Sequence, residues 1–415
     1  MNRILREHAS RIVSESIRAV LPDEAVQRAL RTFEPRGGRI YLAAAGKAAW
    51  QMAQAAVKAV PAIERGIVIT KYGHVPHPIP GIDCLEAGHP VPDENGFAAT
   101  ERMLNMVHGL TAQDTVLFLL SGGGSALMEK PLISGAELQD ITSQLLRCGA
   151  DIVEINTVRK RLSAVKGGRF AQACSPAQVY SIVLSDIIGD PLDMIASGPS
   201  YPDSSTCAQA MAVADKYQLK LSERARTLLG QETPKQLTNV TTQITGSVRE
   251  LCAAAARECA ALGYEPVILT DRLNCEAREA GRFLAAVART HTGDGRATAY
   301  LAGGETVVHV TGTGRGGRNQ ELVLAAAEGI AGLKNAAVLS VGSDGTDGPT
   351  DAAGGYADGD TWETLAAVGC DAAAMLNNND AYHALKAADG LIVTGATGTN
   401  VNDVSVVLIR PDDRE

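Results

Sequence analysis

Short apolar runs alternate with longer amphipathic stretches along most of the 415-residue chain. Runs rich in Val, Ile, Leu and Ala, for example 40–45, 115–120, 179–184 and 336–342, have the length of buried strands. In the stretches between them apolar residues recur every three or four positions, which predicts helices. Strands that alternate with helices favour an α/β fold with a mainly parallel sheet covered by helices.

A polar segment at 231–242 separates two regions of this kind, so we predict an N-terminal domain at 1–238 and a C-terminal domain at 239–415. The predicted helices are at 4–30 with a break at 21–23, 47–60, 94–108, 134–164, 204–230, 247–262, 275–291 and 317–331. The predicted strands are at 40–45, 66–70, 84–87, 115–120, 179–184, 265–269, 297–302, 306–311, 336–342, 391–394 and 404–408.

Composition excludes several classes of partner. The formal net charge of −9 argues against nucleic acid and anionic membranes, because both bind basic surfaces. No apolar run approaches the roughly 20 residues that span a bilayer, and the first residues lack a signal-peptide pattern, so we expect a soluble cytoplasmic protein. The eight cysteines are scattered without a CxxC pair, which favours reduced thiols over disulfides or zinc.

The first of two glycine-rich loops follows an apolar run and reads TGTGRGGRNQE. Gly312, Gly314 and Gly317 should expose backbone N–H groups, and Arg315 and Arg318 add positive charge, so this loop suits a phosphate. It formally fits the dinucleotide pattern GxGxxG, but the acidic residue expected about 20 positions later comes late. The chain has no Walker A sequence, so a kinase of this sequence would not be of the P-loop type.

The second glycine-rich loop, SVGSDGTDGPTDAAGG, follows another apolar strand and holds Asp344, Asp347 and Asp351. Carboxylates are the hard oxygen ligands that Mg²⁺ prefers, and Mg²⁺ usually binds together with a phosphate ester. Asp186, which follows the strand at 179–184, is a further candidate as a metal ligand or as an acceptor of a hydroxyl proton. The two loops therefore indicate chemistry on a nucleotide or a phosphorylated metabolite.

Other polar residues follow the strands of the N-terminal half. Lys47 comes after 40–45 at the start of a predicted helix, where it could reach an anion. The turn Ser121–Ser125 does not match the nucleophile pattern GxSxG, and we expect it to cradle phosphate or carboxylate unless it is a plain tight turn. At 100° per residue Asn156 and Lys166 share one face of a predicted helix, with Arg159 and Ser163, and form a basic stripe.

The histidines at 74, 77 and 89 lie among prolines. A metal site from His74 and His77 is conceivable, but no carboxylate or cysteine nearby completes it. We therefore favour a packing role in the loop for these histidines.

Eight segments, in order and over nearly the whole chain, resemble the glycerate 2-kinases of the MOFRL family: AAAGKAAW, EAGHPVPDENG, SGGGSAL, NTVRKRLSAVKGGR, SDIIGDPLDMIASGPS, GGETVVHVTGTGRGGRNQE, SVGSDGTDGPTDAAGG and TGATGTNVNDVSVVLI. The resemblance implies two α/β domains, a Rossmann-like N-terminal domain with a mainly parallel sheet and a smaller C-terminal MOFRL domain, with the active site in the cleft between them. It also implies phosphorylation of D-glycerate at its 2-hydroxyl with ATP and Mg²⁺. The active-site lysine and arginine proposed for the family fall on Lys47 and Arg318.

We combine the resemblance with the motifs to assign roles. Lys47 would stabilise the transferring group or orient the acceptor hydroxyl. The residues assigned to the phosphates of ATP, beside Arg318, are Gly312, Gly314, Arg315 and Gly317. Those assigned to the carboxylate of glycerate are Ser125, Asn156 and Lys166. Those assigned to Mg²⁺, one of them alternatively as base, are Asp186 and Asp344.

Two other functions stay open at this point. Relatives of this family have often been called hydroxypyruvate reductases, so the alternative is an NAD(P)H-dependent reductase, which would have no use for carboxylates in a glycine loop. A non-catalytic binder of phosphorylated metabolites would keep the loops without needing Lys47. The sequence does not fix the oligomeric state, and a homodimer is one option.

Overall fold

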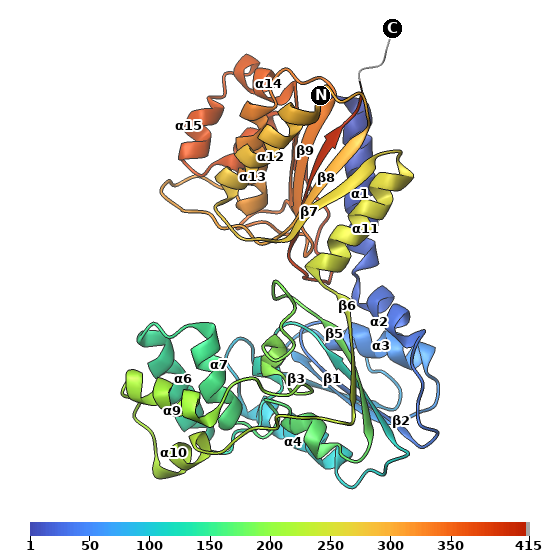
Figure 1. Cartoon of the computed structure of the whole chain (residues 1–415), viewed down its shortest axis with the longest axis vertical. Coiled ribbons are helices and arrows are strands. Elements are labelled where there is room, and N and C mark those ends of the chain that lie inside the picture. Colours follow the sequence, from blue (N-terminus) through green and yellow to red (C-terminus); the bar gives the residue numbers. More distant parts are fainter. Residues whose placement is uncertain (412–415) are drawn as a thin grey trace. The chain divides into compact units, whose positions relative to one another are not determined.

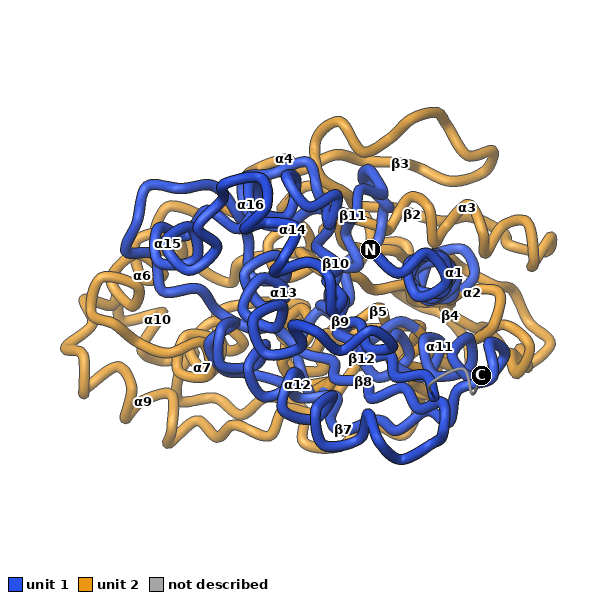
Figure 2. The backbone as a smooth tube through the Cα atoms, turned by 90° about the horizontal axis from the view of Figure 1, so that it is seen from above, with its two compact units in different colours: residues 1–24, 186–189, 246–415 blue, residues 25–185, 190–245 orange. Residues whose placement is uncertain are grey.

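The computed structural model describes residues 1–411 and divides the chain into two compact units (Figure 2). Unit 1 comprises residues 1–24, 186–189 and the chain from 246 on, and unit 2 comprises 25–185 and 190–245. The elements of the first half are α1(Arg3–Ala19), α2(Pro22–Leu30), β1(Ile40–Ala45), α3(Ala49–Ala59), β2(Ile63–Lys71), β3(Ile82–Ala87), α4(Glu94–Val107), β4(Thr115–Leu120), α5(Gly124–Leu127), α6(Gly135–Arg147), α7(Ile152–Arg161), α8(Arg169–Ala173), β5(Gln178–Leu184), a 3₁₀ turn η1(Ile195–Ser197), α9(Cys207–Lys216), α10(Glu223–Leu229) and β6(Val240–Gly246).

The elements of the second half are α11(Val248–Ala261), β7(Glu265–Leu273), α12(Ala277–His291), β8(Thr298–Gly304), α13(Arg318–Gly329), β9(Ala336–Gly342), β10(Gly354–Asp358), α14(Thr361–Ala367), α15(Ala372–Asn377), α16(Ala381–Ala387), β11(Leu391–Ile392) and β12(Asp403–Ile409). Both units are therefore α/β, as predicted.

The sheet of unit 2 has the strand order β3-β2-β1-β4-β5-β6, and β1 to β5 pair in parallel. The central strands β1 and β4 are buried at every position, which is why their sequences are continuous apolar runs. Helices α2 and α3 cover one face of the sheet, and α6, α7, α9 and α10 form a separate helical cluster with its own core. Parallel pairing brings the carboxyl ends of β1, β4 and β5 to one edge, where Lys47, Ser121 and Ser185 follow the strands.

The sheet of unit 1 is mixed, with the order β11-β10-β9-β12-β8-β7. Strands β7 and β8 are parallel, whereas β12 runs antiparallel to both β8 and β9. Helices α1 and α11 pack on one face, and α12 and α13 pack on the other (Figure 1). Because β12 is reversed, its first residue, Asp403, lies beside Gly304 and Gly342 at the carboxyl ends of β8 and β9.

The two units divide the chain differently from the predicted boundary at 238 and 239. The polar segment runs into β6, which is the last strand of the unit 2 sheet, so unit 2 extends to residue 245. Helix α1 belongs to unit 1, because its apolar face, including Leu5, Ile12 and Ile17, is buried in the same core as β8, β9 and β12. No helix within residues 1–411 is long and apolar enough to cross a membrane.

Several predicted elements were wrong in type or extent. The segment 306–311 is not a strand but an irregular stretch with one isolated bridge at Val307. Strand β10 and helices α14 to α16 were not predicted. Helix α7 ends at Arg161, because the next residues leave the helix to hydrogen-bond with 130–132, with Leu132 N donating to Leu162 O.

Candidate active site

The turn after β1 is locked against the turn after β4 in unit 2. Gly46 has φ +128°, and a Cβ atom there would lie 2.2 Å from Ser121 Oγ, so only glycine fits. Lys47 N donates to Gly122 O at 2.9 Å, and Ala48 N donates to Ser121 Oγ at 3.1 Å. The backbone of Lys47 is therefore fixed, while its side chain is exposed and its ammonium group forms no ion pair within residues 1–411.

Lys71, His74 and His89 lie near Lys47, and we call these four residues, with the Ser121–Ser125 turn, the Lys47 cluster. A Cβ atom on Gly123 would lie 3.0 Å from His89 Cδ2 and 3.2 Å from Lys47 Cγ, so these side chains are neighbours. Burial lowers the pKa of His89, and the charges of Lys47, Lys71 and His74 lower it further. Such a concentration of positive charge on an acidic protein suits an anionic ligand.

The other two histidines of this loop, His74 and His77, are exposed, and each contacts a neighbouring group. His77 packs edge-on against Trp50 with ring centroids 4.6 Å apart, and His74 Nδ1 lies 3.2 Å from Lys47 O. No group of three or more His, Cys, Asp or Glu side chains among residues 1–411 is placed to hold a metal.

Ser125 and Asn156 are brought together through a third residue, Ser197. Ser125 Oγ lies 2.9 Å from Ser197 Oγ, and Ser197 Oγ donates to Asn156 Oδ1 at 3.0 Å. Asn156 and Ser197 are buried, whereas Ser125 is only half-buried. Sequence reasoning placed Ser125 and Asn156 in one site but did not identify the serine that links them.

Lys166 is fully buried beneath this turn, which differs from its predicted position on the helix face of Asn156. Its Nζ donates to Ser125 O at 2.6 Å and to Met128 O at 3.3 Å, and lies 3.1 Å from Glu129 Oε2. Burial lowers the pKa of Lys166 to about 8, although the charge of Glu129 opposes this. With no exposed surface, Lys166 supports the turn from within, and this geometry does not favour a direct contact with substrate.

A second set of candidate residues lies in unit 1, where helix α13 begins with Arg318. The carboxylate of Asp347 accepts from Asn319 N at 3.1 Å and from Gln320 N at 2.9 Å, so it caps this helix from the second glycine-rich loop. Burial raises the pKa of Asp347, and the helix amides oppose this rise. Asp347 therefore has a structural role, and Asp351 is likewise engaged, since it accepts from Tyr382 Oη at 2.8 Å.

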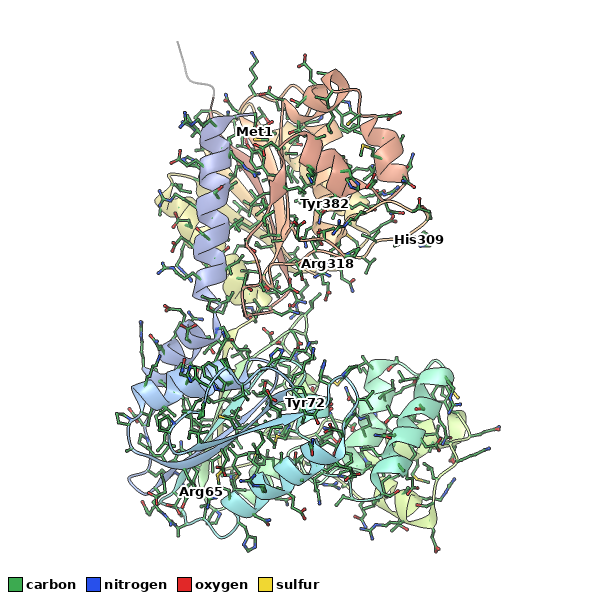
Figure 3. The ribbon with its side chains drawn as sticks, turned by 180° about the vertical axis from the view of Figure 1, so that it is seen from behind. Met1, Arg65, Tyr72, His309, Arg318 and Tyr382 are labelled. Carbon is green, nitrogen blue, oxygen red and sulfur yellow. The ribbon has the colours of Figure 1, made fainter. Side chains whose placement is uncertain are left out.

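The Arg318 guanidinium is held by two carboxylates, and we call these three residues with the start of α13 the Arg318 cluster. Arg318 is labelled in Figure 3. Asp403 accepts from its Nε at 2.5 Å and from its Nη2 at 2.9 Å, and Glu305 lies 3.3 Å from its Nη1. Burial opposes the charge of Arg318, but Asp403 and Glu305 outweigh burial and raise its pKa. Burial raises the pKa of Asp403 to about 6 against the effect of Arg318, so the pair is ionised at pH 7.

The first glycine-rich loop packs on residues 378–380, and its amides are mostly occupied. Cβ atoms on Gly312 and Gly314 would lie 2.2 Å from Asn378 O and 2.4 Å from Asp380 Cβ. All five N–H groups from 311 to 315 donate to groups of residues 378–380. Gly312 and Gly314 thus allow close packing, whereas we predicted amides that are free for phosphate.

Free amides do occur one turn later, at Gly316, Gly317 and Arg318, whose N–H groups form no hydrogen bond within residues 1–411. They line a pocket of about 530 Å³ in unit 1. Its residues are Glu305, Thr306, Val307, Val308, Val310, Gly314, Gly316, Gly317, Arg318, Glu321, Gly348, Pro349 and Asn379. Unpaired amides at a helix N-terminus beside an arginine are a favourable environment for an anion.

Arg315 lies at the surface near this pocket. Its guanidinium lies 4.9 Å from the centre of the Tyr382 ring, and its Nε donates to Pro349 O at 3.0 Å. The stacking on Tyr382 leaves the rest of the exposed guanidinium available to a ligand.

The two predicted metal ligands also belong to unit 1. Asp344 Oδ1 and Asp403 Oδ1 each lie 3.3 Å from the Cβ position of Gly342, so these carboxylates are close neighbours. Asp186 O accepts from Asn402 Nδ2 at 3.2 Å, and the same Nδ2 donates to Glu305 Oε2 at 3.1 Å. The structure therefore brings Asp344 and the backbone of Asp186 to the surroundings of the Arg318 cluster.

Sequence reasoning missed the partners of the charged residues. Glu129 precedes Lys166 by 37 positions and Asp403 follows Arg318 by 85, so no local spacing connects them. The one signal in the sequence was that Asp403 begins an apolar strand. If that strand paired in parallel, Asp403 would lie away from the glycine-rich loops. The reversed direction of β12 instead puts it beside Arg318.

Comparison with known proteins assigns the chain to a family. Residues 8–230 match the family model described as domain of unknown function DUF4147, and residues 298–403 match the MOFRL family. The chain is 51% identical over 412 residues to the D-glycerate 2-kinase of Thermotoga maritima, with 98% of both chains covered. It is 39% identical to a protein of Agrobacterium vitis provisionally named a hydroxypyruvate reductase, covering 97% of this chain and 94% of that one.

Among solved structures, the crystal structure of glycerate kinase from Thermotoga maritima matches with a TM-score of 0.93 and 50% identity, covering 98% of this chain and 99% of that one. A match of this extent includes both units and both clusters. The chain therefore belongs to the glycerate kinase family, in which a DUF4147 segment precedes a MOFRL segment.

Proposed function

We propose that the protein is a D-glycerate 2-kinase that transfers the terminal phosphoryl group of ATP, with Mg²⁺, to the 2-hydroxyl of D-glycerate. The observation that carries the proposal is the Arg318 cluster, in which an arginine and three free amides line a pocket of about 530 Å³. A relative with 51% identity over nearly the whole chain bears the name of this activity. Phosphoryl transfer consists largely of positioning and charge neutralisation, which these groups can supply.

The Arg318 cluster would bind the nucleotide. The free N–H groups of Gly316, Gly317 and Arg318 would donate to phosphate oxygens, and the guanidinium of Arg318, whose charge Asp403 and Glu305 already balance, would act as a further donor. Arg315 would contribute a second, more exposed charge. Val307 and Val310, which are 56% and 72% exposed, offer an apolar wall in the same pocket for the base or ribose.

The Lys47 cluster would bind the acid. The exposed ammonium group of Lys47, fixed at its backbone and without an ion pair in the described chain, would contact the transferring phosphoryl group or the acceptor hydroxyl. Ser125 and Asn156 would orient the acid, and Lys166 would hold the Ser125 turn in place from below. The neighbouring His89, which sequence reasoning did not assign to a site, adds to the positive surroundings.

Mg²⁺ would be held by Asp344 and Asp186. The residues fit this ion, because Mg²⁺ favours carboxylate oxygens and usually takes only one or two of them beside phosphate oxygens and water. Bound there, Mg²⁺ would neutralise charge on the phosphates of the nucleotide.

The test is direct. The purified protein is incubated with D-glycerate, ATP and Mg²⁺, and ADP and the phosphoglycerate product are quantified, the latter by ³¹P NMR. A parallel incubation with NADH and hydroxypyruvate measures NADH oxidation. The proposal requires glycerate-dependent ADP and 2-phosphoglycerate; NADH oxidation without ADP formation would favour the reductase suggested by the name of the Agrobacterium relative.

A further inference from the structure

Ser197 occupies a strained backbone position in unit 2. Ala196, Ser197 and Gly198 have φ angles of 49°, 62° and 64°, so two residues with side chains adopt the left-handed conformation in succession. The strain is held by backbone hydrogen bonds from Gly167 N to Ser197 O at 2.9 Å and from Gly168 N to Gly198 O at 2.7 Å. Strain that the surroundings maintain in this way is a feature of functional sites.

The strained position directs the Ser197 hydroxyl into a chain of three polar groups. Its Oγ lies 3.0 Å from Asn156 Oδ1 and 2.9 Å from Ser125 Oγ. Asn156 Oδ1 can only accept, so the single proton of Ser197 is donated to it. The Ser197 oxygen must then accept in its contact with Ser125, and Ser125 is the donor.

This direction determines what Ser125 can offer to a ligand. Its one proton is used toward Ser197, so toward a ligand Ser125 Oγ can only accept a hydrogen bond through its lone pairs. A carboxylate carries acceptors alone and would meet Ser125 Oγ unfavourably, whereas a hydroxyl can donate to it. Ser125 is also the half-buried end of the chain, while Asn156 and Ser197 are only 5% and 1% exposed.

We propose that Ser197 is a specificity-determining residue that fixes Ser125 as an acceptor for a substrate hydroxyl that does not react. This hydrogen-bond chain ends at the carboxamide of Asn156, which cannot take up a proton. It therefore cannot accept the proton that a hydroxyl loses when it is phosphorylated. This inference rests on the proposed function. The hydroxyl held by Ser125 is then the 3-hydroxyl of D-glycerate, and the 2-hydroxyl is left to receive the phosphoryl group. This replaces the carboxylate as the predicted partner of Ser125.

The experiment compares D-glycerate with D-lactate, which lacks the 3-hydroxyl. Dissociation constants for both acids are measured by calorimetry with the wild type, Ser197→Ala and Ser200→Ala, alongside the KM of D-glycerate. Alanine is suitable at 197, because Ala196 already adopts the same backbone region. Ser200→Ala is the matched control, because it also removes a buried serine hydroxyl, but one that lies 3.0 Å from Ser181 Oγ and has no role in the Ser125 chain.

Ser197→Ala is expected to weaken D-glycerate binding by about 5- to 10-fold, the effect of one hydrogen bond, with D-lactate unchanged. The share of 3-phosphoglycerate in the product is expected to rise, and Ser200→Ala should behave as the wild type. Equal weakening of both acids by Ser197→Ala, or the same loss of discrimination in Ser200→Ala, would overturn the inference.

The calorimetric comparison also separates this inference from the proposed function. Preferential binding of D-glycerate over D-lactate without any phosphorylation would refute the kinase and leave the role of Ser197 intact. Phosphorylation of D-glycerate with an unchanged glycerate-to-lactate ratio in Ser197→Ala would refute the role of Ser197 alone. A wild type that binds neither acid would refute both.

Discussion

Replacing Lys166 by methionine tests how the Ser125 turn is supported. Lys166 and Glu129 are both fully buried, and their charged atoms are 3.1 Å apart. Neither Glu129 oxygen accepts a hydrogen bond within the described residues, and the next cation, Arg159, is 3.7 Å away. Removing Lys166 therefore leaves a buried carboxylate with one distant partner.

The expected cost is about 3 to 5 kcal/mol of unfolding free energy, the range for breaking a buried ion pair from one side. Methionine nearly fills the volume of lysine, so a cavity adds little. Ser125 O and Met128 O also lose their donor, at 2.6 and 3.3 Å, and the turn that carries Ser125 should loosen. We expect a raised KM for the acid at temperatures where the variant remains folded.

Urea unfolding followed by circular dichroism measures this effect, with two controls. Lys216→Met removes an exposed lysine that is 2.6 Å from Glu154, and loss of such a surface pair should change the unfolding free energy far less than loss of the buried pair. The double variant Lys166→Met/Glu129→Leu should recover most of the loss, because no uncompensated charge remains. A Lys166→Met variant within about 1 kcal/mol of the wild type, or a double variant no better than the single one, would refute the reasoning.

Three further predictions concern the two clusters. Lys47→Ala should lower turnover at least about 100-fold, measured by ADP release, because it removes a group that stabilises developing charge. The melting temperature should stay unchanged in a thermal melt, because the side chain is exposed. Arg318→Lys should lower kcat/KM for ATP by roughly 10- to 100-fold, because lysine cannot keep the two-point contact with Asp403, and an unchanged value would remove Arg318 from the nucleotide site. Burial raises the pKa of Asp403 to about 6, so between about pH 4 and 6 Asp403 is protonated in the folded protein and ionised in the unfolded chain. The stability that this proton contributes is present below about pH 4 and is lost as the pH rises through about 6. Relative to Asp403→Asn, the wild type should lose up to roughly 3 kcal/mol over that interval in urea unfolding, and parallel pH profiles of the two proteins would contradict this.

The sequence was most informative where burial alone determines structure. Strands β1, β4 and β9 are buried at every residue, and their apolar runs were predicted with the bounds that the structure has. Strand β10, with the sequence GGYAD, was missed although it is equally buried, because Gly354 and Gly355 serve close packing rather than hydrophobicity. A Cβ atom on Gly354 would lie 1.9 Å from Ser340 O on the neighbouring strand, a constraint that no sequence pattern reveals.

The candidate site was predictable in its residue types and less so in its geometry. Lys47 and Arg318 follow from their positions after strands and at a helix start, which local sequence indicates. The support of each site comes from distant partners, such as Glu129 for Lys166 and Asp403 for Arg318, and depends on strand direction and on where a helix ends. Periodicity placed Lys166 on a helix that in fact ends five residues earlier, so its predicted exposure was wrong.

The membership of α1 in unit 1 has a consequence for synthesis in the cell. The helix is synthesised before unit 2, yet the core that buries Leu5 and Ile12 also contains Val404 and Val406 of β12. Unit 2 can therefore fold while translation continues, whereas the apolar face of α1 stays uncovered until β12 has been synthesised. A nascent chain stalled before β12 should accordingly be a preferred client of chaperones that bind apolar helices.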